Sequence, residues 1–79
     1  MNIIIVGCGK VGYALARELS VEKNDICLID RDNVVLQNAI NILDIQAISG
    51  DGTSYKILLD AGVKEADLLI AVTDKDEIN

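Results

Sequence analysis

Short apolar runs and longer stretches with helical spacing alternate along this chain. The apolar runs cover residues 2–6, 26–30, 45–49 and 67–73. The first run is hydrophobic on both faces, a pattern typical of a parallel strand that is covered on two sides. Between the runs, apolar positions recur every three or four residues, which predicts helices. The resulting β-α-β-α-β-α-β order predicts βαβ units and a parallel sheet.

Three helices are predicted between the strands. The first covers residues 10 to about 19, and its expected apolar face comprises Val11, Ala14, Leu15 and Leu19. Asp32 is a favourable N-cap for the second helix. The apolar stripe of that helix comprises Val35, Leu36, Ala39, Ile40 and Leu43. The third helix covers residues 54–61, with Tyr55 expected in or beside the core. Gly62 follows it, where a left-handed residue often ends a helix.

This pattern predicts a single α/β unit with a Rossmann-like, doubly wound parallel sheet of order 3-2-1-4 and helices on both faces. Residues 74–77 have the D-x-x-E form of a capping box, which predicts a further helix just before Asn79. We therefore expect residues 1–79 to be the N-terminal part of one domain, truncated before its last strands. The apolar run at residues 68–72 would lie at a sheet edge, which favours self-association.

A glycine-rich motif of the form G-x-G-x-x-G directly follows the first strand and opens the first helix. It consists of Gly7, Cys8, Gly9, Lys10, Val11 and Gly12. Gly7 permits a tight turn, Gly9 lets a pyrophosphate approach the backbone, and Gly12 lets the helix pack closely on the strand. The N–H groups at a helix start attract phosphates. The motif in this context predicts a dinucleotide site.

Acidic residues follow the other strands at the same edge of the predicted sheet. Asp30 ends the second strand, where a carboxylate accepts the ribose hydroxyls and repels a 2′-phosphate, so NAD is favoured over NADP. The adjacent Arg31 weakens that preference, because an arginine can receive a 2′-phosphate. Asp51 is interpreted as an adenine contact or as a helix cap. Thr73 and Asp74 are interpreted as contacts of the distal half of the dinucleotide or as capping residues.

The composition argues against several other classes of protein, among them nucleic-acid-binding, disulfide-rich, zinc-binding and membrane-spanning proteins. The chain has 13 acidic and 7 basic residues, a formal net charge of −6 and two tyrosines as its only aromatics, which argues against nucleic acid as a ligand. Two cysteines and no histidine exclude a disulfide-dense scaffold and a standard zinc site. Cys8 and Cys27 are expected to be small packing residues. No run approaches the roughly 20 apolar residues of a membrane helix. The sequence thus predicts a soluble protein of a reducing compartment.

Three segments carry a family resemblance that extends over the whole chain. They are the G-D-G-T loop after the third strand, the segment AGVKEADLLIAVT, and the D-E-x-N tail at residues 76–79. With the glycine motif and ICLIDRD, these segments resemble the N-terminal Rossmann domain of Trk potassium-uptake regulators, the RCK (KTN, TrkA-N) family.

The resemblance implies a regulatory function without catalysis. Such domains bind NAD, with NADH, ATP or ADP as alternatives, and assemble as dimers or rings on the cytoplasmic face of an integral membrane potassium transporter. It implies pyrophosphate contacts from Gly7, Cys8, Gly9, Lys10 and Val11, a ribose contact from Asp30, an adenine contact from Asp51, and distal contacts from Thr73 and Asp74. The residues alone leave an alternative open, the cofactor-binding half of an NAD-dependent oxidoreductase or epimerase. In that case the catalytic residues would lie beyond Asn79.

Overall fold

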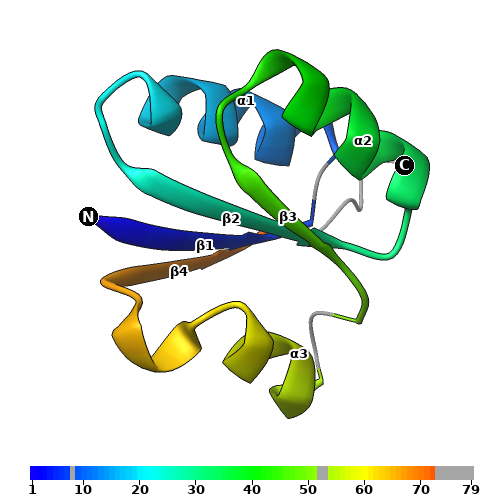
Figure 1. Cartoon of the computed structure of the whole chain (residues 1–79). Coiled ribbons are helices and arrows are strands. Elements are labelled where there is room, and N and C mark those ends of the chain that lie inside the picture. Colours follow the sequence, from blue (N-terminus) through cyan, green and yellow to red (C-terminus); the bar gives the residue numbers. More distant parts are fainter. Residues whose placement is uncertain (8, 52–53, 73–79) are drawn as a thin grey trace.

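The computed structural model describes residues 1–7, 9–51 and 54–72. In these ranges a parallel sheet lies between two layers of helix (Figure 1). The strands are β1 (Asn2–Val6), β2 (Asp25–Asp30), β3 (Gln46–Ser49) and β4 (Leu68–Ala71). The helices are α1 (Lys10–Ser20), α2 (Asn33–Ile42), α3 (Tyr55–Asp60) and a short 3₁₀ helix, η1 (Val63–Glu65).

The strand order is β3-β2-β1-β4, and all neighbouring strands are parallel. In the register, Ile5 of β1 lies between Leu28 of β2 and Ile70 of β4. The predicted order and parallel sheet are therefore confirmed. Because the strands run in one direction, their carboxyl ends lie along one edge, which we call the carboxyl edge. The loops that follow β1, β2 and β3 leave the sheet there (Figure 1).

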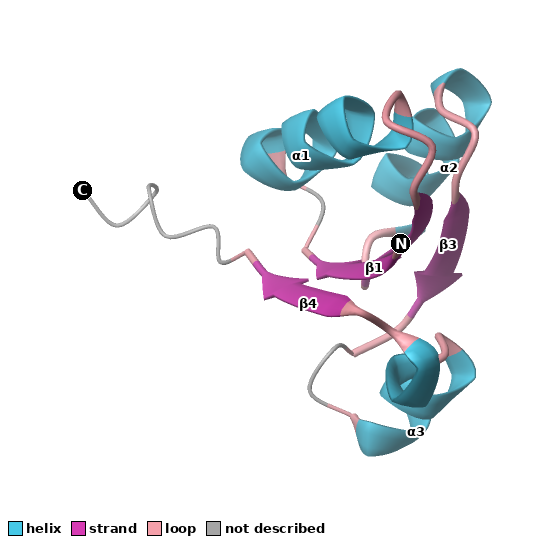
Figure 2. Ribbon diagram, turned by 90° about the vertical axis from the view of Figure 1, so that its left-hand side faces the viewer, coloured by secondary structure: helices cyan, strands magenta, loops and turns pink. Residues whose placement is uncertain are grey.

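Successive strand residues face opposite layers, so the core divides into two clusters. Figure 2 shows α1 and α2 on one face of the sheet and α3 on the other. On the first face, the buried strand residues are Ile3, Ile5, Ile26 and Leu28, and they pack with Ala16, Leu36 and Ala39. On the second face, Ile4, Cys27 and Ile29 are buried against residues of α3 and η1, among them Ile57 and Leu58. The prediction of helices on both faces is confirmed.

The second helix and its ends match the sequence pattern. The side chain of Asp32 accepts hydrogen bonds from the N–H groups of Val34 and Val35, as expected of an N-cap. All five residues of the predicted stripe are buried or partly buried. Gly62 lies after α3 with φ of 88°, the left-handed conformation expected there. The predicted helix start at residues 74–77 lies outside the described residues.

Two burial predictions are wrong. Val11 was expected on the apolar face of α1, but its side chain is 61% exposed, and Ala14 is also exposed. The buried face of α1 instead centres on Gly12 and Ala16, because α1 contacts β1 through its smallest residues. Tyr55, expected in or beside the core, is 64% exposed at the start of α3, since Ile57 and Leu58 fill the sheet-facing side of that helix.

Gly12 determines how closely α1 approaches β1. A Cβ atom at this position would lie 2.0 Å from the carbonyl oxygen of Gly7 and 3.0 Å from its carbonyl carbon. Both atoms belong to the backbone, so no side-chain rotation relieves the overlap. The predicted role of Gly12 in close helix–strand packing is confirmed.

We expect Gly12→Ala to lower the free energy of unfolding by about 2–3 kcal/mol, because α1 must move away from the sheet and overpacking costs this much. Urea denaturation monitored by circular dichroism measures the effect. The control is Glu18→Ala on the exposed face of the same helix, expected to change stability by less than about 0.5 kcal/mol. Equal stability of the two variants would contradict the packing role of Gly12.

Candidate functional site

The turn after β1 is held by backbone contacts on both sides. The N–H of Gly7 donates to the carbonyl of Ile29 over 2.7 Å, and Gly7 has φ of 100°, a conformation that L side chains rarely adopt. A Cβ atom at Gly7 would also lie 2.3 Å from the carbonyl oxygen of Val72, just after β4. The predicted tight turn therefore requires glycine for two independent reasons.

Helix α1 begins at this turn and points its N-terminus at the carboxyl edge. Gly9 is the N-cap, with an extended conformation and no side chain, and its carbonyl accepts a hydrogen bond from the N–H of Tyr13 over 2.9 Å. The first turn of α1 contains no acidic residue, and the Lys10 side chain is exposed. No acidic side chain of the first turn therefore competes with a bound anion for the free N–H groups of that turn.

Asp30 ends β2 beside this helix start. Its Oδ1 accepts a hydrogen bond from the N–H of Asp32 over 2.8 Å, and Asp32 in turn caps α2. Asp30 is partly buried, as expected for a residue that leaves the sheet. These contacts fix the backbone that carries the Asp30 carboxylate, so the carboxylate is held at the carboxyl edge.

The loops after β2 and β3 lie side by side. Asp30 is in register with Ser49, and the N–H of Gly50 donates to the carbonyl of Asp30 over 2.9 Å. Beyond this pair, an Nη2 atom of Arg31 lies 3.3 Å from Oδ2 of Asp51. Arg31 and Asp51 are 20 positions apart in the sequence, and no motif indicates that they form this ion pair. The only signal for the ion pair was the predicted strand order, which places the second and third strands side by side.

The carboxyl edge thus gathers most of the described residues that the sequence singled out. They are Gly7, Gly9, Lys10, Val11, Gly12, Asp30, Arg31 and Asp51. Cys8, Thr73 and Asp74, also predicted for the site, lie outside the described residues, as do Gly52 and Thr53 of the loop after β3. The roles of all these residues toward a ligand stay predictions.

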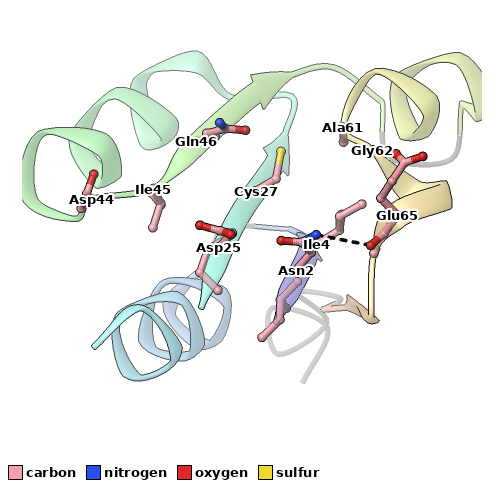
Figure 3. Close-up of a pocket in the computed structure, with 13 residues that line it drawn as sticks. Asn2, Ile4, Asp25, Cys27, Asp44, Ile45, Gln46, Ala61, Gly62 and Glu65 are labelled. Atoms are coloured by element: carbon pink, nitrogen blue, oxygen red, sulfur yellow. Dashed lines mark hydrogen bonds between the residues drawn. The ribbon is translucent and has the colours of Figure 1, made fainter. Parts of the chain in front are cut away.

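A cavity of about 500 Å³ lies at the opposite, amino edge of the sheet. Figure 3 shows it between the sheet and the α3–η1 segment, with Asp25, Cys27 and Gln46 on the strand side and Glu65 opposite. None of the residues predicted for the nucleotide site lines this cavity. It is therefore separate from the carboxyl edge and does not bear on the predicted site.

Cys27 is a packing residue of the second core cluster. It is 6% exposed, and burial raises the pKa of its thiol above the ordinary value, because the thiolate would lose hydration. A protonated, buried thiol suits the predicted packing role. Within residues 1–7, 9–51 and 54–72 there is no cluster of three acidic or cysteine residues placed to hold a metal ion. The helices in these ranges are also too short or too polar to span a membrane.

The fold and the glycine-lined carboxyl edge define a Rossmann-type α/β domain. Residues 3–79 match the family model of the TrkA-N domain. The chain is 47% identical over all 79 residues to the Trk system potassium uptake protein TrkA of Haemophilus influenzae, and 46% identical to that of Halomonas elongata. A TrkA homolog of Archaeoglobus fulgidus is 43% identical over the same length. This chain belongs to the TrkA-N domain family.

These relatives are much longer than the chain. The 79 residues span 17% of the length of the Haemophilus and Halomonas proteins and 18% of the Archaeoglobus protein. Among solved structures, the Kef CTD of Shewanella denitrificans in its AMP-bound form superposes with a TM-score of 0.75 and 26% identity. That match covers 98% of this chain and 46% of the Kef chain. The Rossmann-like fold is therefore shared with a protein whose structure was solved in an AMP-bound form.

We expect Asp32→Ala to lower the free energy of unfolding by about 1 kcal/mol, because it removes the cap of α2. Asp32→Asn keeps an oxygen that can accept the same hydrogen bonds and serves as the matched control, expected to retain most of the stability. Thermal denaturation of both variants makes the comparison. An alanine variant as stable as the asparagine variant would show that the capping contacts contribute nothing.

Proposed function

We propose that this chain is the nucleotide-binding regulatory domain of a potassium uptake system. An adenine nucleotide binds at the carboxyl edge, with NAD as the first candidate and NADH, ATP and ADP as alternatives. The observation that carries the proposal is the start of α1, where Gly9 supplies no side chain and the first turn contains no acidic residue, beside the Asp30 carboxylate. A helix start binds phosphate, and a carboxylate at this strand end binds ribose hydroxyls.

Each candidate residue has a proposed role. The pyrophosphate lies against five residues of the glycine motif, Gly7, Cys8, Gly9, Lys10 and Val11, and Gly12 supports the site by letting α1 pack closely. Asp30 binds the ribose, and Asp51 contacts the adenine. Thr73 and Asp74 contact the distal half of a dinucleotide. The AMP-bound Kef structure supports a nucleotide at this type of fold without indicating which nucleotide this chain prefers.

The proposed role is regulatory and not catalytic. The relatives compared above are named as potassium uptake proteins, which favours a regulator over the cofactor-binding half of an oxidoreductase or epimerase. The domain acts on the cytoplasmic face of an integral membrane transporter, and it self-associates as a dimer or ring. A nucleotide shifts the conformational equilibrium only by its differential affinity, so a tenfold preference for one state contributes about 1.4 kcal/mol.

Calorimetric titration of the chain with NAD, NADH, ATP and ADP tests this function. We expect Asp30→Ala to weaken NAD binding by about 1–3 kcal/mol, the scale of a lost charge-assisted hydrogen bond. Asp25→Ala is the matched control, because Asp25 begins the same strand at the amino edge. Since Asp30 also accepts from the N–H of Asp32, unfolding is measured alongside. Unchanged NAD affinity in a folded Asp30→Ala variant would remove Asp30 from the site.

We expect Gly9→Val to abolish binding of all four nucleotides, because any side chain at Gly9 occupies the space that the phosphates need. Ala14→Val, which adds the same side chain on the exposed face of α1, should bind normally. Circular dichroism establishes that both variants are folded. A folded Gly9→Val protein that still bound ATP or NAD would place the phosphates elsewhere.

A further inference from the structure

We propose that Asp51 is a specificity-determining residue that makes the carboxyl edge discriminate against nucleotides with a 2′-phosphate. It does so by engaging Arg31, the side chain that would otherwise receive that phosphate. The inference rests on the proposed function, in which the ribose lies at Asp30. It adds that the site excludes nucleotides with a 2′-phosphate and that the Arg31–Asp51 ion pair is responsible.

The position of the ion pair follows from the sheet. Asp30 and Ser49 are in register at the ends of β2 and β3, and the hydrogen bond from the Gly50 N–H to the Asp30 carbonyl continues this pairing by one residue. The next residues on the two loops include Arg31 and Asp51, whose charged atoms lie 3.3 Å apart. The guanidinium of Arg31 therefore extends from the loop after β2 toward the loop after β3. Arg31 directly follows Asp30, the residue proposed to bind the ribose.

The local charge opposes a second phosphate. At the end of β2 and on the loops that follow β2 and β3, Asp30, Asp32 and Asp51 contribute three carboxylates, against the single guanidinium of Arg31. Residues 31–32 and 50–54 contain no other basic residue. A 2′-phosphate adds about 1.5–2 negative charges. It would have to compete with Asp51 for Arg31 while lying beside Asp30. Sites that accept a 2′-phosphate present an arginine to it, whereas here the arginine is already paired.

The pair is exposed, and this makes the inference testable without damage to the fold. The side chains of Arg31 and Asp51 are 78% and 46% exposed, and exposed ion pairs contribute little to folding stability. Asp51→Asn removes the charge and keeps the shape of the side chain and one oxygen acceptor. It should therefore release Arg31 for a 2′-phosphate without unfolding the chain.

The experiment compares NAD and NADP, which differ only in the 2′-phosphate, by calorimetry at low ionic strength. For the parent chain we expect NAD to bind more tightly. In Asp51→Asn the ratio of the two affinities should shift toward NADP by about five- to tenfold, because the guanidinium of Arg31 is no longer paired with Asp51 and can pair with the 2′-phosphate. The ratio is the readout, since any adenine contact of Asp51 affects both ligands equally.

Further variants assign the effect to the ion pair. Arg31→Gln is made alone and together with Asp51→Asn, which completes a double-mutant cycle. The double variant should show no shift relative to Arg31→Gln, because the guanidinium that Asp51→Asn would release is gone. Asp44→Asn lowers the negative charge by the same amount at the amino edge, and its NAD-to-NADP ratio should equal that of the parent.

The possible results separate this inference from the proposed function. Normal NAD binding with no shift in Asp51→Asn overturns the inference and leaves the proposed function intact. A shift that persists without Arg31, or that Asp44→Asn reproduces, also overturns it, because the effect would then be one of overall charge. Failure of the parent chain to bind NAD, NADH, ATP or ADP overturns the proposed function and the inference with it.

Discussion

The contact between Gly12 of α1 and the carbonyl of Gly7 is the constraint on which the arrangement of this domain depends. Two backbone segments touch where no Cβ atom fits. This contact sets the depth of α1 on the sheet, and the depth determines which of its side chains are buried. Ala16 then lies fully in the core, and Val11 lies in solvent. The same contact brings the start of α1 to the end of β1, so the candidate phosphate site is a direct result of helix packing.

The parallel sheet adds the second half of the site. With β1 central and β2 beside it, the strand ends bring Gly7, Asp30 and Gly50 together although they are distant in sequence. The Asp30 carbonyl, the Asp32 cap and the Gly50 N–H join the loops into one hydrogen-bonded edge. Side chains on these loops are thereby held with less conformational freedom than free loops would have, which reduces the entropic cost of binding a ligand.

The sequence predicts the architecture well because its strongest signals are periodic. The apolar runs determine the strands, the βαβ order determines the sheet, and Asp32 and Gly62 mark helix ends through local chemistry. The rotation of α1 could not be predicted, since Val11, Leu15 and Leu19 share helical spacing while the actual buried face is chosen by glycine contacts with β1. The exposure of Tyr55 has a similar cause, because six residues of α3 leave space for few side chains against the sheet.

The position of each described candidate residue at the carboxyl edge was predictable from the sequence, but the interactions among these residues were not. The glycine motif and Asp30 each have a local signature, whereas the Arg31–Asp51 pair joins loops that only the strand order brings together. Whether two exposed charged side chains pair depends on their conformations, and the spacing of residues along the sequence does not predict these. The sequence alone presents Arg31 as a residue that weakens the preference for NAD, whereas the structure shows it paired with Asp51.

The contact of Gly7 with the carbonyl of Val72 has a mechanical consequence. Closely packed backbone atoms resist compression, so a displacement of the turn after β1 must displace the residue that follows β4. The N–H of Val72 also donates to the carbonyl of Val6 over 2.8 Å, which ties the same two segments from the other side. The turn after β1 and the end of β4 therefore move together, and a displacement of either is transmitted to the other.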